Sequence, residues 1–481
     1  MNHAMVRYLI GWMLGVESLF LLLPALTALI YREDVVLAYV GVAALCMALA
    51  ALFCHKKPTN TRFYAREGFV TVALCWIVLA LTGALPFMLS GEIPFVVDAL
   101  FETISGFTTT GATILSDVEA LSHASLLWRS VTHWVGGMGV LVFMLIVLPL
   151  AGGQTIHLMR AESPGPSVSK LSPHLRDTAM ILYAIYLGMT ILETILLLFG
   201  GMPLFDALCT SMATAGTGGF GIWNTSIAHY NSYYLQAVVT VFMILFGINF
   251  SVYFLLLTRR FKAAFRIEEV RVYLGVILAS SVVIALNVRH MFPSLLDSFH
   301  HAAFQVASII TTTGFSTVDF NQWPALSKAI LVLLMFIGAC AGSTGGGMKC
   351  SRILLMCKSI RKEMQFLIHP RAVRVNKIDG RRVPHEVMRS VNVFMIAYLL
   401  LFILSVLLLS ITNEELITNF TAVAATLNNV GPGLELVGPA ANFGFFSPLS
   451  KIVLMFDMLA GRLEVFPMLL LFAPATWKRE K

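Results

Sequence analysis

Four glycines that follow short apolar segments are the residues of this sequence best suited to binding an ion. The segments are DALFETISGFTTTG at 98–111, DALC through GTGG at 206–219, HAAF through TTTG at 301–314 and TNFT through LNNVG at 418–431. A row of backbone carbonyls that all face one ion needs backbone angles that a side chain resists, so glycine is expected there. For one copy, a helix end with an ordinary glycine cap is the simpler interpretation. Four copies, each with its last glycine thirteen residues after its first residue, favour a cation filter.

The segments that carry these glycines are too short to cross a membrane, and each lies between two longer apolar runs. A hydrocarbon core about 30 Å thick requires roughly 20 apolar residues per helix. Runs of that length lie near 8–31, 35–54, 68–90, 123–151, 178–200, 232–257, 270–290, 325–348, 388–411 and 449–475. The repeated unit is therefore a span, a re-entrant pore helix, a turn and a second span.

Non-helical backbone at membrane depth is tolerated only where it is buried in protein or lines a water-filled cavity. We therefore expect the four turns to meet around one axis. The sequence predicts an all-α polytopic membrane protein with about ten transmembrane helices and four span–pore-helix–span repeats in a pseudo-fourfold arrangement. The predicted division is two N-terminal transmembrane helices at 1–67 and pore repeats at 68–175, 176–268, 269–386 and 387–481.

Composition and charge agree with a membrane protein. The 481 residues are 58% hydrophobic and 12% charged, and the mean hydropathy is +0.81. If both termini are cytoplasmic, most of the 33 Lys and Arg residues fall on cytoplasmic segments, as the positive-inside rule requires. The net charge of +7 then needs no nucleic-acid partner. The seven cysteines show neither paired disulfide spacing nor a zinc pattern.

A glycine-rich stretch at 338–347 interrupts what would otherwise be one long helix. It holds five glycines, and each interior glycine costs about 1 kcal/mol relative to alanine. A phosphate-binding loop is excluded, because Gly347 is followed by Met348 and not by the required Lys-Ser/Thr. An intramembrane loop that faces a cavity fits the rule on irregular backbone and is the predicted gate. The gate residues within it are Gly342, Gly345, Gly346 and Gly347.

Arg462 lies near the middle of the last span and is the second predicted gate residue. An unpaired charge there would cost about 3 kcal/mol, so Arg462 is expected to face the pore or a partner. Asp457 and Glu464 are close in sequence, which leaves an ion pair between two helices as the alternative. Other polar residues in apolar surroundings could line an ion path or make a buried hydrogen bond between helices. They are Glu17, Glu102, Glu193 and Asn249.

The four loops resemble those of the Trk/Ktr/HKT superfamily of potassium transporters. The likeness extends through WRSVTHWVGGMG at 128–139, RAESPGP at 160–166, GSTGGG at 342–347 and GRLE at 461–464. Two helices precede the first repeat, a layout similar to the bacterial TrkH/TrkG branch rather than the eight-span KtrB branch. The resemblance implies a multi-pass protein of the bacterial cytoplasmic (inner) membrane, with potassium as its substrate and no covalent cofactor.

In that superfamily, glycine at all four filter positions goes with potassium, whereas serine in the first goes with sodium in some plant members. The second loop leaves two candidates, because alignment on Thr217 favours Gly218 whereas spacing and the following Phe220 favour Gly219. We choose Gly219. The fourth loop lacks threonines at its turn. The residues to which the resemblance assigns monovalent-cation binding are Thr110, Gly111, Gly218, Gly219, Thr313, Gly314, Val430 and Gly431.

The resemblance also implies a homodimer in membrane lipid and a cytosolic TrkA-type subunit that binds nucleotides. In the superfamily, the arginine that matches Arg462 protrudes below the filter as an electrostatic barrier. The longest cytoplasmic loop, at 349–389, is basic and contains Asp379-Gly380, a favourable hairpin turn. It is either a docking surface or a solvated loop.

Three function classes remain open at this point. The first is a gated, channel-like potassium pore. The second is a potassium/proton or potassium/sodium symporter with coupled transport, which the shared orientation of the four repeats disfavours. The third is a membrane enzyme, which the missing catalytic constellation disfavours, so the chain is predicted not to be an enzyme.

Overall fold

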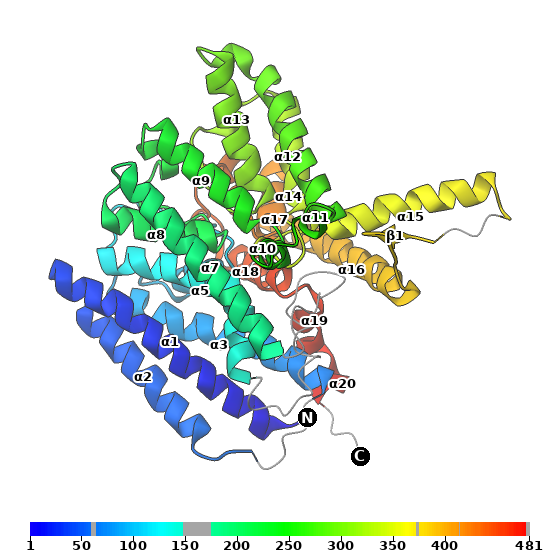
Figure 1. Ribbon diagram of the computed structural model, residues 1–481. Helices are drawn as coiled ribbons and strands as arrows, with labels where there is room; N and C mark the ends of the chain where they lie inside the picture. The colour runs from blue at the N-terminus through cyan, green and yellow to red at the C-terminus, as the bar shows by residue number, and fades with distance from the viewer. Residues whose placement is uncertain (59–63, 148–174, 372–374, 413, 478–481) are drawn as a thin grey trace.

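The computed structural model describes residues 1–58, 64–147, 175–371, 375–412 and 414–477. The motif at 160–166, which contributed to the resemblance, lies outside these residues. The described chain is a bundle of helices with one short hairpin (Figure 1).

A pair of long helices opens the chain, and four groups of helices follow it (Figure 1). Each group contains a long helix, then a helix of 12 to 16 residues, and then a broken or shortened helix. The opening pair is α1 (His3–Tyr31) and α2 (Val36–Cys54). The long helices are α3 (Ala65–Leu89), α7 (Leu175–Phe199), α12 (Glu268–Asn287) and α16 (His385–Leu409). The short helices are α4 (Val96–Phe107), α8 (Leu204–Ala215), α13 (Leu295–Ile310) and α17 (Leu416–Leu427).

The third member of each group and the connecting elements complete the described chain. The third members are α5 (His123–Val147), α9 (Tyr233–Phe246) with α10 (Phe250–Leu257), α14 (Ala325–Ile337) with α15 (Cys350–Ile368), and α18 (Pro448–Arg462) with α19 (Phe466–Phe472). The connecting elements are α11 (Phe261–Ala264), α20 (Pro474–Trp477), the 3₁₀ helices η1 (Ser226–His229), η2 (Arg289–Met291), η3 (Phe320–Gln322), η4 (Ser410–Thr412) and η5 (Glu435–Val437), and the strands β1 (Lys377–Ile378) and β2 (Arg381–Arg382).

Six helices of the described chain are long and apolar enough to cross a membrane, and the bent pair α9–α10 makes seven. They are α1, α2, α3, α7, α12 and α16, and with the bent pair they match seven of the ten predicted spans. The other three predicted spans correspond to α5, α14 and the α18–α19 pair. On the outer faces, Leu37, Leu278 and Leu400 are each more than 60% exposed, which suits contact with lipid.

The third helix of every group loses its helical geometry near its middle or its end. In α5 the distortion is at Met138, and α9 turns by 93° into α10. Helix α14 ends at Ile337, before Gly338 with its φ of 69°. Residues 463–465 separate α18 from α19, with φ of 58° at Glu464 and 67° at Val465. The sequence predicted only the break after α14 and missed the other three. The signals in α5 and after α9 were the glycines at 136, 137 and 139 and the Gly-Ile-Asn at 247–249.

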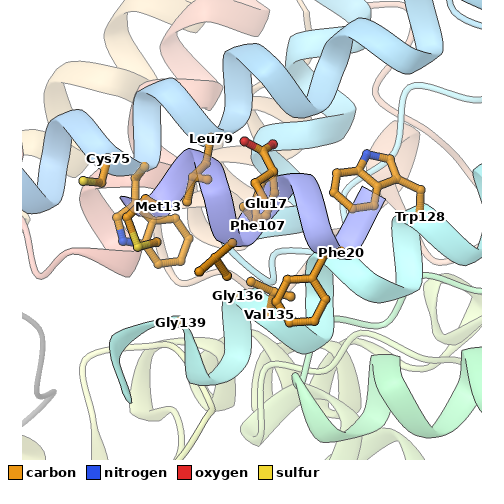
Figure 2. Close-up of a pocket in the computed structure, with 12 residues that line it drawn as sticks. Met13, Glu17, Phe20, Cys75, Leu79, Phe107, Trp128, Val135, Gly136 and Gly139 are labelled. Carbon is orange, nitrogen blue, oxygen red and sulfur yellow. The ribbon is translucent and has the colours of Figure 1, made fainter. Parts of the chain in front are cut away.

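The opening helix α1 packs against α2, α3 and α5, and an apolar cavity lies among α1, α3 and α5 (Figure 2). Phe107, at the end of α4, also lines it. Glu17 is the carboxyl in the lining, and its Oε2 accepts a hydrogen bond from Thr82 Oγ1 at 2.6 Å. Of the two interpretations of Glu17, the structure thus shows the hydrogen bond between helices.

Candidate ion-binding ring and gate

Each of the four short helices is followed by a turn, and the four turns have the same backbone conformation. The last residue of α4, α8, α13 and α17 lies four residues before a predicted filter glycine. Two residues before each glycine the backbone is left-handed, with φ between 53° and 60°, which costs a non-glycine residue about 1–2 kcal/mol. Such strained positions cluster at functional sites. The left-handed residues are Thr109, Thr217, Thr312 and Asn429, and the glycines, with φ of 78–98°, are Gly111, Gly219, Gly314 and Gly431.

One backbone hydrogen bond repeats in all four turns and aligns the second loop with the others. The N–H before each glycine donates to the carbonyl five residues earlier, at 2.8–2.9 Å. In the second loop Gly218 makes this bond, and Gly219 has the positive φ of 78°. Gly219 is therefore the structural equivalent of Gly111, and Gly218 is the equivalent of Thr110. The four bonds are Thr110 to Ser105, Gly218 to Ala213, Thr313 to Ser308 and Val430 to Ala425.

The four glycines meet in a closed ring, which we call the glycine ring (Gly111, Gly219, Gly314 and Gly431). A β-carbon on each would lie within 2.7 Å of the carbonyl oxygen that precedes the next loop's glycine. A side chain at any of the four positions would therefore collide with backbone. All four glycines also line one cavity, together with residues that follow them in sequence. The oxygen that such a β-carbon would meet is Gly218 O for Gly111, Thr313 O for Gly219, Val430 O for Gly314 and Thr110 O for Gly431.

The electrostatics of the ring favour a cation. Each short helix ends next to the ring, and a helix C-terminus carries roughly half a negative elementary charge. The carbonyl oxygens of Thr110, Gly218, Thr313 and Val430 lie at the contacts between loops. Rings of backbone carbonyls that replace the hydration shell are the chemistry of monovalent-cation filters.

The side chains around the ring are unequal. In loops one and three, two threonine hydroxyls share a hydrogen bond, Thr108 with Thr110 at 2.8 Å and Thr311 with Thr313 at 2.7 Å. In loop four, Asn429 Nδ2 instead donates to Thr110 Oγ1 of loop one at 2.9 Å. Asn429 therefore joins two neighbouring loops, whereas the threonine pairs make hydrogen bonds within one loop.

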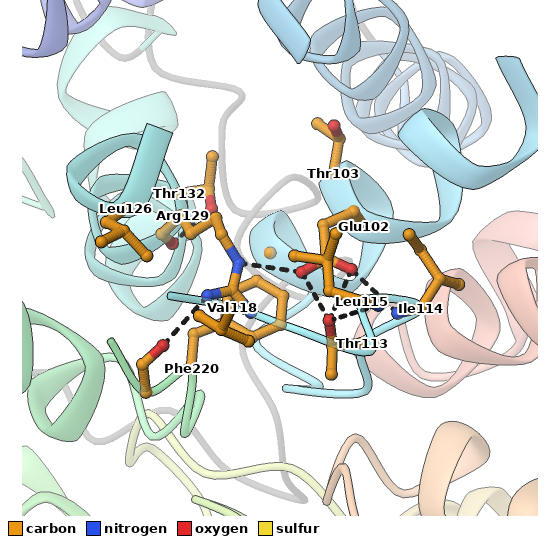
Figure 3. A network of polar contacts seen from close by, with 12 residues as sticks. Glu102, Thr103, Thr113, Ile114, Leu115, Val118, Leu126, Arg129, Thr132 and Phe220 are labelled. Carbon is orange, nitrogen blue, oxygen red and sulfur yellow. Dashed lines mark hydrogen bonds and ion pairs between the residues drawn. The ribbon is translucent and has the colours of Figure 1, made fainter. Parts of the chain in front are cut away.

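A buried ion pair supports the contact between loops one and two (Figure 3). Arg129 Nε on α5 donates to Glu102 Oε1 on α4 at 2.8 Å, and both side chains are at most 2% exposed. Glu102 also accepts from Thr113 Oγ1, which follows the first glycine of the ring. The Arg129 guanidinium lies 4.0 Å from the centre of the Phe220 ring and donates to Gly221 O in the second loop. Glu102 is thus a structural partner of Arg129, which the sequence did not single out.

His133 lies behind the same contact. Its Nδ1 is 2.8 Å from Gly106 O, and its Nε2 accepts from Phe220 N at 3.1 Å. The neutral tautomer with a proton on Nδ1 makes both bonds. A β-carbon on Gly218 would lie 2.2 Å from this imidazole, so glycine is required there as well.

The residues between α14 and α15, which we call the 338–349 loop, pack against the turns on the side opposite the cavity. Gly346 N donates to Thr312 Oγ1 at 2.6 Å, and Gly347 N donates to Asn428 O at 2.9 Å. Both acceptors precede the glycines of their turns, whereas the cavity is lined by residues that follow them. The predicted gate residues Gly345, Gly346 and Gly347 therefore lie against the third and fourth turns. Gly342 lies instead at the α9–α10 break, where its carbonyl accepts from Phe250 N at 3.0 Å.

Arg462 joins three of the four broken helices. Its guanidinium donates to Thr344 O in the 338–349 loop at 2.9 Å and to Gly136 O and Gly137 O of α5 at 2.6 and 3.0 Å. The loop in turn bonds the α9–α10 break, through Cys340 N to Gly247 O at 3.0 Å. The structure thus brings the two predicted gate elements into direct contact.

The carboxyls that follow or precede Arg462 in sequence have other partners. Glu464 pairs with Arg352 at 2.5 Å, and Asp457 accepts from Ser405 at 2.7 Å. Asn249 Oδ1 caps α10 by accepting from Ser251 N, and Glu193 is fully buried on α7. Within the described ranges, no three His, Cys, Asp or Glu side chains form a group that could hold a metal ion.

Comparison with known proteins places these features in context. The model of the TrkH family, described as a cation transport protein, matches residues 36–479. The Trk system potassium uptake protein TrkH of Salmonella typhimurium is 38% identical over 99% of this chain and all of its own length. The Trk system potassium uptake protein TrkG of Escherichia coli K12 is 34% identical over 99% of this chain and its own full length.

A solved structure has the same overall fold. The crystal structure of the potassium transporter TrkH from Vibrio parahaemolyticus superposes with a TM-score of 0.90 at 35% sequence identity. The match covers 99% of this chain and all of that one.

Proposed function

The chain belongs to the TrkH family of cation transport proteins, and on this premise we propose that it takes up potassium across the cytoplasmic membrane through a gated, channel-like pore. The glycine ring carries this proposal. Four carbonyl oxygens and four helix C-termini converge on it, and its four contacts close a circuit. Such a site transports a cation and does not require a catalytic group, so the protein acts as a transporter and not as an enzyme.

The ring is the potassium filter in this proposal. Glycine at all four positions leaves the carbonyls free of side chains, and the relatives are named potassium uptake proteins. Potassium is the substrate, and the chain needs no resident cofactor. The residues that bind it are Thr110, Gly111, Gly218, Gly219, Thr313, Gly314, Val430 and Gly431.

The architecture around the filter is a pseudo-fourfold set of repeats with about ten transmembrane helices. The repeats are 68–175, 176–268, 269–386 and 387–481, after two N-terminal helices in 1–67. Support comes from the recurring order of long, short and broken helix and from the shared geometry of the four turns. The distribution of Lys and Arg supports cytoplasmic termini in a bacterial inner membrane.

The gate is formed by the 338–349 loop and Arg462. The loop lies against two of the four turns, and a fixed positive charge under the filter opposes the passage of a cation. Partners in this proposal are a second copy of the chain and a cytosolic TrkA-type subunit on the basic 349–389 region.

Complementation tests the ion and the filter together. The chain, expressed in a bacterium that lacks potassium uptake, is expected to restore growth at low potassium, and Gly111→Ser is expected to abolish it. Failure of the well-expressed native chain to complement would refute potassium uptake.

Flux in liposomes tests the mechanism. Labelled rubidium is expected to enter whether or not a proton or sodium gradient is present. Uptake that requires either gradient would instead establish the coupled symporter.

A further inference from the structure

A carboxylate on α12 bonds both the 338–349 loop and the first turn of α15, which follows the loop. Glu269 Oε1 accepts hydrogen bonds from Ala341 N at 2.7 Å and from Ser351 N at 3.0 Å. Glu269 is only 7% exposed. Hydrogen bonds to a charged acceptor are about twice as strong as neutral ones, so this clamp ties the loop at Ala341 to the start of α15 at Ser351.

The residue before Glu269 is held by the cytoplasmic hairpin. Glu268 N, at the start of α12, donates to Asp379 Oδ1 at 2.7 Å. Asp379 and Gly380 form the turn between β1 and β2, with φ of 52° and 78°, so the predicted hairpin is confirmed. Asp379 is exposed, but its hydrogen bond reaches Glu268, the residue next to the buried Glu269.

Helix α15 closes the same junction. Lys358 Nζ pairs with the Glu268 carboxylate at 2.6 Å and donates to Lys377 O of the hairpin at 2.6 Å. In Figure 1, α15 extends away from the helix bundle with the hairpin beside it. Two adjacent residues therefore contact both parts of the protein. Glu268 bonds the hairpin and Lys358 of α15, and Glu269 bonds the 338–349 loop.

The loop passes the linkage on to the glycine ring. Its Gly346 and Gly347 bond the third and fourth turns, and its Thr344 carbonyl accepts from Arg462. Hydrogen bonds and short stretches of backbone thus connect the exposed turn at Asp379 to the third and fourth turns of the ring, and the buried Glu269 side chain lies between them.

We propose that Glu269 is a positioning residue for the gate, through which the Asp379 hairpin stabilises the 338–349 loop in its place beneath the glycine ring. This inference rests on the proposed gating function of that loop. A displacement of the hairpin at the cytoplasmic surface frees the first turn of α12, loosens the clamp and lets the loop leave the ion path. Spatial continuity alone does not establish coupling, so the test measures whether the two residues act through each other.

The experiment compares rubidium flux through the full chain in liposomes. Glu269→Ala is expected to raise flux roughly tenfold, because two bonds to a charged acceptor are lost. Glu269→Gln keeps an acceptor oxygen and is expected to stay near the native flux. Selectivity for rubidium over sodium remains unchanged in both, which separates loosening of the gate from damage to the filter.

The hairpin has its own pair of variants. Asp379→Gly removes the acceptor, but Gly-Gly still forms this turn, and it is expected to raise flux roughly threefold. Asp379→Asn keeps an acceptor and tolerates the left-handed backbone, so its flux is expected to match the native chain. The exposed acids Glu363 on α15 and Glu386 on α16, each changed to Ala, are controls for the loss of a negative charge on the helices before and after the hairpin.

The double variant Glu269→Ala/Asp379→Gly decides the proposal. If the flux of the double variant is no higher than that of Glu269→Ala alone, the two residues act through each other and the proposal is supported. If the increases in flux of the two single variants multiply in the double variant, the residues act independently and the proposal is refuted. Native flux in Asp379→Gly also refutes it, and this variant remains informative if Glu269→Ala does not fold. If Arg462→Ala raises flux while both linkage variants stay native, the linkage is wrong and the gate stands. A native chain without rubidium flux refutes the proposed function itself.

Discussion

The guanidinium of Arg462 donates a hydrogen bond to the carbonyl oxygen of Thr344 at 2.9 Å, which joins the end of α18 to the 338–349 loop. Because the same guanidinium also reaches Gly136 O and Gly137 O, it holds three of the four broken helices together. Any rearrangement of the loop must break or replace these bonds.

Removal of this side chain tests the gate. We expect Arg462→Ala to raise rubidium flux in liposomes roughly tenfold, since bonds to a charged donor contribute about 1.5–3 kcal/mol. Arg462→Lys retains the charge but cannot present a fork to two carbonyls, so its flux is expected to lie in between. Native conductance and open probability in Arg462→Ala would exclude it from the gate.

The first glycine of the ring has a matched control in the same chain. Gly111 and Gly91 have φ of 80° and 79°, but a β-carbon on Gly91 meets nothing within 4 Å. Gly111→Ser and Gly91→Ser both introduce backbone strain of about 1 kcal/mol, because each glycine has a positive φ. Only Gly111→Ser also disturbs the ring. Rubidium uptake and its ratio to sodium uptake are expected to fall in Gly111→Ser alone. Equal losses in both variants would show that strain, and not the ring, is responsible.

The Glu102–Arg129 pair offers a test of the support behind the ring. Arg129→Met leaves a buried carboxylate unpaired and is expected to destabilise the protein by about 3–5 kcal/mol, more than Glu102→Leu/Arg129→Met together. The stabilities of the two variants are compared by thermal unfolding in detergent. The half-exposed pair Lys328–Glu435, at 3.8 Å, is the control, and its loss is expected to cost at most about 1 kcal/mol. A double variant less stable than Arg129→Met would contradict this account.

Gly345 tests how tightly the loop is packed. A β-carbon there would lie 2.5 Å from the Ala339 side chain and 2.8 Å from Thr311 O. We expect Gly345→Ala to push the loop away from the third turn and to raise rubidium flux severalfold with selectivity intact. Gly275→Ala, on α12 with nothing within 4 Å of the new β-carbon, is expected to behave as the native chain does. Wild-type flux in Gly345→Ala would mean that the loop lies outside the ion path.

Local patterns in the sequence predicted the four turns well. The register of glycines and the apolar segments before them are local properties, and the short helices end where that register places them. The choice of Gly219 over Gly218 followed from spacing, and its positive φ agrees with it. Backbone conformation at a glycine depends mainly on its immediate neighbours, which is why it could be read in this way.

Contacts between distant residues were beyond the same reasoning. Nothing in the sequence pairs Glu102 with Arg129 or aims Asn429 at Thr110, because each pair is set by how separate helices pack. The bend after Gly247 was missed for a related reason. A single Gly-Ile-Asn in an apolar run is compatible with a straight helix until Cys340 and Gly342 supply partners for the freed backbone.

The glycine ring is contributed by one polypeptide, and its quarters are joined by different side chains. The Glu102–Arg129 pair supports the contact between loops one and two, whereas Asn429 joins loop four to Thr110 of loop one. In an assembly of four identical subunits, one altered codon changes every quarter at once. Here an altered codon changes one quarter and leaves three as they were. Each loop can therefore acquire its own substitutions over generations, and ion preference can be adjusted in quarter steps by the history of a single gene.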